Sequence, residues 1–303
     1  MAQHSIQVDG HCLSILTHNE EYPGIPVVFL HGITLVADFW LPTLPTTLAT
    51  TPCYFINLPA HYPSQILPEA KSLPLTCEQL ATQLHRAIQA LVNDRPVILV
   101  GYSAGGLAAL SLAAYYPTSV SRVLCISGSA NGQWNGVMGG LQRLCCMGYL
   151  GIWLFKLTYK LLTLNPFLYR WISGLFAGDR SAYFDASSLE PTLSAVYSKA
   201  IHHSPDDLAY LFHSFASMDL SEELSRIQSP VLILAGDCDP VISHHQTQHL
   251  AKTIPQVELQ VLSGMGHMFF AERLTEYQQV LTSWISQANC TTYHDCRHLL
   301  DLL

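Results

Sequence analysis

The chain has 303 residues, of which 49% are hydrophobic and 12% charged, so it is long enough and apolar enough to bury a large core. Its formal net charge is −8, and its 14 Lys and Arg residues are scattered along the sequence rather than clustered. This composition excludes a disordered chain and argues against a nucleic-acid-binding surface.

The chain begins with a predicted hairpin. Residues 6–8 and 13–16 are mostly apolar and flank Asp9-Gly10, a dipeptide that readily adopts the positive φ angles of a tight turn. The later apolar runs end abruptly at turns or prolines, as buried strands do. These runs predict further strands at residues 26–30, 53–58, 96–100, 123–127, 231–235 and 257–262.

Helical patterns alternate with these strands. They predict helices at residues 76–92, 104–116, 243–253 and 272–287. Thr76 is the expected N-cap of the first of these helices, with Gln79 at the capping-box position. Continuous apolar strands alternating with helices specify an α/β fold, with a mostly parallel, doubly wound sheet covered on both faces.

One long stretch interrupts this alternation. Between residues 127 and 231 the pattern is helical, rich in Leu, Trp, Tyr and Phe, and lacks a convincing strand. We therefore predict a helical lid inserted between two late strands, over the carboxyl edge of the sheet. The predicted boundaries are residues 1–129 and 221–288 for the core, 130–220 for the lid, and 289–303 for a C-terminal tail without fixed structure.

The most apolar part of this insertion, Leu144–Phe155, contains 12 uncharged residues between Arg143 and Lys156. A helix needs about 20 apolar residues to cross a bilayer. We therefore predict a buried or interfacial helix and no transmembrane segment. Lys156 and Lys160 lie four residues apart on this helix. They are expected at a lipid interface with the apolar face of the helix turned inward, so the sequence allows peripheral contact with a membrane.

The strongest local pattern is Gly101-Tyr102-Ser103-Ala104-Gly105, which joins the strand predicted at 96–100 to the helix predicted at 104–116. A hydroxyl becomes an effective nucleophile when a rigid turn exposes it and a base takes its proton. A strand–Gly-x-Ser-x-Gly–helix turn exposes the serine, because its glycines let strand and helix approach closely. We therefore predict that Ser103 is a catalytic nucleophile.

A base and an acid are predicted from two later loops. His267 follows the last predicted strand, after a Gly-Met-Gly run that allows its ring to turn back over the sheet. The loop after residues 231–235 offers Asp237 and Asp239. We predict Asp239 as the acid, because Asp237 lies nearer the strand end and because Pro240 holds the following backbone extended. Ser103, Asp239 and His267 then form a triad.

The negative charge that develops on a substrate carbonyl requires two backbone N–H donors. We predict Ala104, directly after the nucleophile, and Ile33, in the loop that follows residues 26–30. His31 of this loop is expected to brace it by hydrogen bonding rather than to act as a base. The residues predicted to bind substrate are Tyr102, Trp40, Trp134 and Met268.

With these elements assembled, the chain resembles the α/β-hydrolase fold superfamily, in its lidded esterase, lipase and thioesterase-like branch. The resemblance spans about residues 5–288 and rests on the motifs around His31, Ser103, Asp239 and His267. It implies hydrolysis of an ester through an acyl-enzyme on Ser103, with no cofactor. One departure is Asn57-Leu58-Pro59-Ala60-His61-Tyr62, where many relatives have Asp-Leu-Pro-Gly-His-Gly, so we expect an altered loop near the pocket.

The predicted substrate is a small lipophilic acyl compound, because the aromatic and aliphatic side chains of the insertion exceed what a small lid can bury against itself. Thioester hydrolysis, acyl transfer and non-enzymatic ligand binding on the same fold remain open alternatives. The sequence leaves the oligomeric state open.

Nine cysteines without a Cys-x-x-Cys pair, and an N-terminus without a signal-peptide pattern, indicate a reduced, cytoplasmic setting. No metal site is predicted, since Cys290, His294, Cys296 and His298 lack the spacing of a zinc module.

Overall fold

The computed structural model describes residues 1–290 of the chain. Within these residues, one sheet of nine strands forms the centre of the molecule, in the order β1-β2-β4-β3-β6-β7-β8-β9, with β5 paired to β2. The strands are β1 (Ala2–Val8), β2 (His11–His18), β3 (Val27–Leu30), β4 (Cys53–Ile56), β5 (Gln65–Ile66), β6 (Val97–Tyr102), β7 (Val120–Ile126), β8 (Val231–Gly236) and β9 (Val257–Leu262).

The sheet is antiparallel at one edge and parallel elsewhere. β1, β2 and β4 pair in antiparallel fashion, whereas each of the neighbouring pairs from β4 to β9 is parallel. The predicted hairpin is present, since Asp9 and Gly10 have φ angles of 46° and 76° between β1 and β2. Strands β3, β4, β6 and β8 are buried along their whole length, as strands covered on both faces are.

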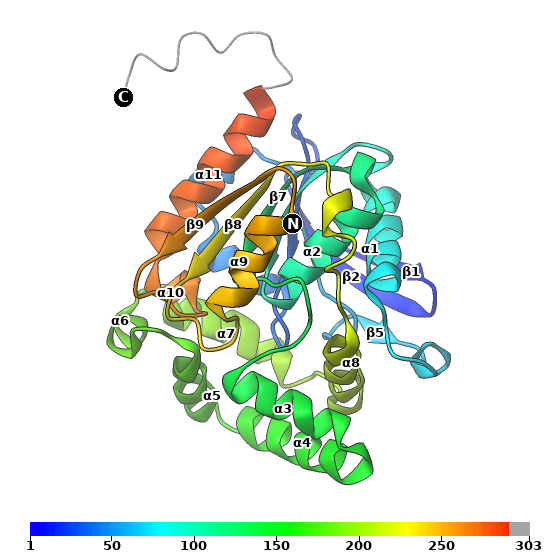
Figure 1. Cartoon of the computed structure of the whole chain (residues 1–303), viewed down its shortest axis with the longest axis vertical. Coiled ribbons are helices and arrows are strands. Elements are labelled where there is room, and N and C mark those ends of the chain that lie inside the picture. Colours follow the sequence, from blue (N-terminus) through cyan, green and yellow to red (C-terminus); the bar gives the residue numbers. More distant parts are fainter. Residues whose placement is uncertain (291–303) are drawn as a thin grey trace.

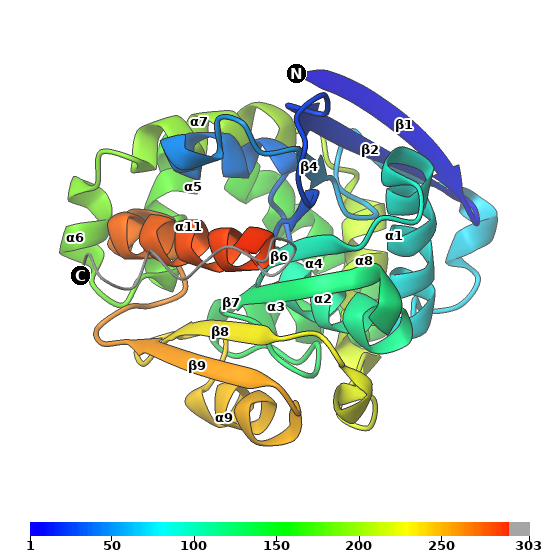
Figure 2. The same ribbon diagram turned by 90° about the horizontal axis from the view of Figure 1, so that it is seen from above.

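Helices cover both faces of this sheet, as Figure 2 shows. α1 (Cys77–Val92), α2 (Ala104–Tyr115) and α9 (His244–Thr253) lie on one face, and α11 (Leu274–Cys290) lies on the other. The predicted capping pair of Thr76 and Gln79 opens α1. The structure therefore confirms the predicted α/β fold with a mostly parallel sheet.

Six helices connect β7 to β8. They are α3 (Gly136–Cys146), α4 (Gly148–Thr163), α5 (Pro166–Ser173), α6 (Arg180–Asp185), α7 (Leu189–Ala200) and α8 (Pro205–Ser217). Figure 1 shows them together beyond the carboxyl ends of the parallel strands. We refer to residues 130–220 as the insertion.

The prediction of one helix across Leu144–Phe155 is wrong. The chain forms two helices here, because α3 ends at Cys146 and α4 begins at Gly148. Gly148 has a φ angle of 73°, a left-handed conformation that glycine adopts without a steric cost and that breaks a helix. No helix within residues 1–290 combines the length and the apolar character needed to span a bilayer.

The final helical segment also differs from its prediction at its start. A short helix, α10 (Phe269–Glu272), precedes α11. The sequence predicts a single helix at residues 272–287, whereas α11 begins two residues later, at Leu274, and continues to Cys290. The last residues of the predicted tail, including the Cys/His pattern from His294 onward, lie outside the described residues.

Candidate active site

Ser103 occupies a strained turn between β6 and α2. Its φ and ψ angles are 55° and −116°, a region that side-chain-bearing residues rarely adopt. The turn is tight because α2 lies against β3: a Cβ atom added to Gly105 would lie 2.1 Å from the carbonyl oxygen of Leu30. The sequence Gly-x-Ser-x-Gly therefore presents the Ser103 hydroxyl at the carboxyl edge of the sheet.

The side chains of Ser103, His267 and Asp239 are joined by hydrogen bonds, although they come from three separate loops. Nε2 of His267 lies 2.9 Å from Oγ of Ser103, and Nδ1 of His267 lies 2.7 Å from Oδ2 of Asp239. His267 and Asp239 are almost fully shielded from solvent. This geometry allows His267 to take a proton from Ser103 while Asp239 holds the ring in place.

The two aspartates of the loop after β8 have different surroundings. The second carboxylate oxygen of Asp239 accepts hydrogen bonds from Val241 N (2.8 Å) and Ile242 N (3.0 Å), so both of its oxygens are used. Asp237 is exposed, and its carboxylate accepts a hydrogen bond from Gly264 N at 2.7 Å. This bond lowers the pKa of Asp237 from its ordinary value. Asp237 thus stabilises the turn, and it does not contact His267.

In the part of the chain that the structure describes, two backbone N–H groups beside Ser103 have no protein acceptor. Within residues 1–290, neither Ile33 nor Ala104 donates its N–H in a hydrogen bond to another residue. The loop carrying Ile33 passes directly against Ser103, since a Cβ atom on Gly32 would lie 3.2 Å from Cβ of Ser103. The arrangement leaves both donors free for an oxygen that is bound at Ser103.

Three buried histidines pack edge to face beside this loop. The ring centroids of His31 and His61 are 4.7 Å apart, and those of His61 and His203 are 5.2 Å apart. His31 Nδ1 donates to Gly32 O (2.8 Å), which is the bracing role that the sequence predicts, and His61 Nε2 accepts from Thr34 N at 2.9 Å.

His203 comes from the insertion, and its Nδ1 accepts a hydrogen bond from Tyr62 N at 2.9 Å. Burial lowers the pKa of His31 and of His203 to about 3, and it lowers the pKa of His61 well below its ordinary value. The three rings are therefore neutral at pH 7, and they tie the loop of Ile33 to the insertion.

Glu272 connects the loop of His267 to the start of α6. Its buried Oε1 accepts hydrogen bonds from Gly178 N (2.8 Å), Asp179 N (3.0 Å) and Gly266 N (3.1 Å), and its Oε2 accepts from Met268 N at 3.2 Å. Because Gly266 and Met268 flank His267 on both sides, the carboxylate fixes the position of the His267 loop. The sequence around Glu272 does not identify it as part of the site, because its hydrogen-bond partners are all backbone groups.

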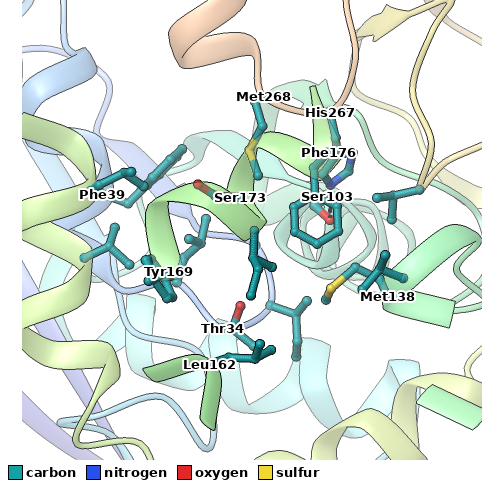
Figure 3. Close-up of a pocket in the computed structure, with 18 of the residues that line it drawn as sticks. Thr34, Phe39, Ser103, Met138, Leu162, Tyr169, Ser173, Phe176, His267 and Met268 are labelled. Carbon is teal, nitrogen blue, oxygen red and sulfur yellow. Dashed lines mark hydrogen bonds between the residues drawn. The ribbon is translucent and has the colours of Figure 1, made fainter. Parts of the chain in front are cut away.

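An apolar cavity opens at Ser103 between the core and the insertion (Figure 3). Ser103 and His267 lie at one side of it, while Leu162 and Tyr169 of the insertion lie farther away. The residues that the insertion contributes are Trp134, Val137, Met138, Leu141, Tyr159, Leu162, Thr163, Tyr169, Ile172, Ser173, Phe176, Thr192, Leu193 and Val196.

Three of the four residues predicted to bind substrate line this cavity, namely Tyr102, Trp134 and Met268. Tyr102 also donates a hydrogen bond to His267 O at 2.8 Å, and burial raises the pKa of Tyr102 well above its ordinary value. Trp40 is placed differently from its prediction. It is fully buried in the core, 5.2 Å from Phe29 between ring centroids, and is not among the residues that line the cavity.

Comparison with known proteins identifies relatives along almost the whole chain. A protein of Stutzerimonas stutzeri named for carbamate hydrolysis, RutD, is 24% identical over 274 residues, which cover 89% of this chain and 95% of that protein. The pimeloyl-[acyl-carrier protein] methyl ester esterase of Vibrio cholerae is 24% identical over 270 residues, covering 87% and 95% of the two chains. These relatives are hydrolases by name.

The fold has close counterparts among solved structures. An esterase from Exiguobacterium antarcticum superposes with a TM-score of 0.73 at 18% sequence identity, and the match covers 93% of this chain and 98% of the esterase. The model of the alpha/beta hydrolase family matches residues 27–278, which include every strand from β3 to β9 and the side chains of Ser103, Asp239 and His267. This chain therefore belongs to the alpha/beta hydrolase family.

Proposed function

We propose that this protein is a serine hydrolase that cleaves carboxylic esters with a lipophilic acyl group, and that Ser103 is its nucleophile. The observation that carries the proposal is the chain of hydrogen bonds from Asp239 through His267 to Ser103 at the mouth of an apolar cavity. The family of the chain and the hydrolase names of its relatives support the same class of reaction.

In the proposed reaction, Oγ of Ser103 attacks the ester carbonyl carbon while Nε2 of His267 takes the hydroxyl proton. The carbonyl oxygen becomes negatively charged and accepts hydrogen bonds from the backbone N–H groups of Ile33 and Ala104. His267 then gives its proton to the departing alcohol, which leaves an acyl ester on Ser103. Water attacks this ester as His267 takes one of its protons. His267 then returns that proton to Oγ of Ser103 as the bond from Oγ to the acyl carbon breaks, and the carboxylic acid is released.

The substrate class follows from the walls of the cavity. Aliphatic and aromatic side chains dominate the part contributed by the insertion, with Met138, Leu141 and Leu162 among them. Transfer of an acyl chain from water to such walls is favourable by about 0.8 kcal/mol for each methylene group. The acyl group is therefore assigned to this cavity, with the alcohol leaving on the solvent side. In this role the insertion acts as the lid of the site.

Hydrolysis of p-nitrophenyl esters of increasing acyl length tests this assignment. We expect kcat/KM to rise by about fourfold for each added methylene until the cavity is filled, and Ser103→Ala to abolish turnover at every length. A maximum at the acetyl ester would contradict a lipophilic substrate.

Two neighbouring leucines provide a matched pair of variants for the same assay. Leu162 lines the cavity, whereas Leu161, on the same helix, is half-exposed and does not. Leu162→Trp is expected to lower kcat/KM for the longer esters and to leave the acetyl ester unaffected. Leu161→Trp is expected to leave the whole series unchanged. Equal effects of the two variants would contradict the assignment of the acyl chain to this cavity.

A further inference from the structure

The solvent-exposed apolar side chains of this protein are concentrated on one part of the insertion. Of the nineteen large hydrophobic side chains that are exposed in the described residues, eleven lie between residues 147 and 171, on α4 and α5 and the turns beside them. Tyr149 is 88% exposed, Phe167 is 74% exposed and Leu164 is 72% exposed. We call these exposed apolar side chains between residues 147 and 171 the α4–α5 face. A concentration of this kind marks an interaction surface.

The spacing of the exposed residues shows that the face is a regular feature of α4. Side chains three or four residues apart lie on the same side of a helix. The leucines that share the outer side of α4 in this way are Leu150, Leu154, Leu157, Leu161 and Leu164. On the inner side, Gly151, Phe155 and Tyr159 are buried. A helix that is apolar on both sides needs a partner for its second side.

The charged side chains that this part of the sequence itself contributes are all cationic. No Asp or Glu occurs between Trp134 and Gly178, although the chain as a whole has 22 acidic and 14 basic residues. The cations of this stretch are Arg143, Lys156, Lys160 and Arg170. Lys156 pairs with Asp206 (2.6 Å) and Arg170 with Glu190 (3.8 Å), both on neighbouring helices of the insertion.

Arg143 and Lys160 are exposed, and in the described part of the chain no acidic side chain lies within ion-pair distance of either. The α4–α5 face is thus an apolar surface with a cationic margin on a protein whose net charge is −8. Such a surface complements a bilayer that carries anionic headgroups.

We propose that the α4–α5 face docks on the surface of an anionic phospholipid membrane. Leu150, Leu157 and Leu164 enter the boundary between headgroups and acyl chains, and Trp153 and Trp171 lie at the level where aromatic side chains are favoured. Arg143 and Lys160 are then close to the anionic headgroups.

The position of the cavity indicates where the substrate of a docked molecule comes from. α4 and α5 separate the α4–α5 face from the cavity, since Leu162, Tyr169 and Ile172 of the same two helices line it. A docked molecule holds its cavity one helix layer from the bilayer, so its ester substrate is drawn from the membrane. This last step rests on the proposed function, whereas the docking itself does not.

A second copy of the chain fits the face less well than a lipid surface does. Apposition of two α4–α5 faces in a symmetric dimer brings the cations of one copy toward those of the other, on a stretch that has no carboxylate of its own. An anionic bilayer covers the same apolar residues and neutralises those cations. The charge distribution therefore favours the membrane.

Flotation of the full chain with vesicles tests the proposal. The vesicles are phosphatidylcholine alone, or phosphatidylcholine with about one quarter phosphatidylglycerol. Wild-type protein is expected to float with the anionic vesicles and less with the neutral ones. Leu157→Glu/Leu164→Glu is expected to weaken binding by about tenfold for each leucine replaced.

The chain contains a matched control for this double variant. Leu67 and Leu73 are 43% and 72% exposed, compared with 42% and 72% for Leu157 and Leu164, and they lie outside the insertion. Leu67→Glu/Leu73→Glu makes the same change in charge and is expected to float like wild type. Circular dichroism and turnover of p-nitrophenyl acetate verify that both double variants are folded.

Three outcomes would overturn the proposal. In the first, wild-type protein stays at the bottom of the gradient with anionic vesicles. In the second, Leu157→Glu/Leu164→Glu floats as well as wild type. In the third, sedimentation shows a wild-type dimer that this double variant dissociates, with no vesicle binding by either form.

Ser103→Ala separates the docking from the catalysis. This variant is expected to float like wild type. If the wild-type protein floats but hydrolyses no ester, the proposed function fails while the membrane contact stands.

Discussion

The carboxylate of Asp239 lies 2.7 Å from Nδ1 of His267, and its other oxygen accepts hydrogen bonds from the backbone N–H groups of Val241 and Ile242. The carboxylate is therefore held by its own loop before it orients the histidine. A fixed acceptor at Nδ1 places the proton of neutral His267 on that atom and leaves Nε2 free to accept the proton of Ser103.

Replacing this carboxylate by an amide is expected to disable the proposed catalysis. Asp239→Asn presents an N–H group or a weaker acceptor to Nδ1 and favours the wrong tautomer of His267, so kcat is expected to fall by about 10⁴-fold. Asp237→Asn changes an exposed turn that does not contact His267, and kcat is expected to stay within about threefold. Steady-state kinetics on a short p-nitrophenyl ester measures both. A larger loss in Asp237→Asn would assign the acid to Asp237.

Glu272 is expected to matter for both stability and turnover. Glu272→Gln leaves one oxygen where two carboxylate oxygens accept four backbone N–H groups, and a buried donor without an acceptor costs about 1–3 kcal/mol. The resulting shift of the His267 loop is expected to lower kcat by about 10²-fold with little change in KM.

Glu276→Gln is the matched control for that variant. Glu276 is half-exposed and lies 3.8 Å from Arg273, so its replacement is expected to change the free energy of unfolding by less than about 1 kcal/mol. Urea denaturation and kinetics measure both variants. If the two variants behave alike, Glu272 does not position the base.

The buried histidines predict acid sensitivity. The pKa of His31 and of His203 is about 3 in the folded chain, below the ordinary value of 6.5. Between these values the unfolded chain binds more protons than the folded chain does, so stability falls as the pH is lowered from about 6.5 toward 3. The loss is at most about 1.4 kcal/mol per pH unit for each histidine.

His203→Asn keeps an acceptor for Tyr62 N and removes one titrating ring. The free energy of unfolding, measured by urea denaturation at pH 7, 6 and 5, is expected to depend less steeply on pH in this variant than in wild type. His213→Asn, at an exposed position, is the control and is expected to keep the wild-type slope. An unchanged slope in His203→Asn would show that His203 is not held neutral by burial.

The sheet was predictable because local sequence determines it. Most strands of the parallel part are short apolar runs that end at a turn, and α1 shows a helical periodicity, with Thr76 capping it as expected. The side chains of Ser103, His267 and Asp239 also follow from local sequence, because loops at the carboxyl ends of parallel strands converge. The structure brings these three side chains together, and their catalytic roles stay a prediction.

Other parts of the site depend on contacts between segments that are distant in the sequence, so no local sequence pattern indicates them. Glu272 is recognisable only when Gly178 and Gly266 are seen to converge on it, and His203 only when the insertion meets His61. Trp40 shows the opposite case, because its place near a motif suggested a pocket residue. An aromatic residue at such a place is often part of the hydrophobic core, as Trp40 is. The prediction that the apolar face of α4 turns inward is wrong for Leu150, Leu157 and Leu161, which are exposed. Sequence periodicity identifies the faces of a helix but not which of them meets solvent.

Labelling with a fluorophosphonate probe tests the central claim most directly, because the probe reacts with a serine only when a base activates it. The wild-type chain is expected to form a covalent adduct that mass spectrometry locates at Ser103, and Ser103→Ala is expected to remain unlabelled. His267→Ala is expected to react far more slowly, since Ser103 then lacks its base. Absence of labelling in the folded wild-type chain, or equal labelling of Ser103→Ala, would contradict the account.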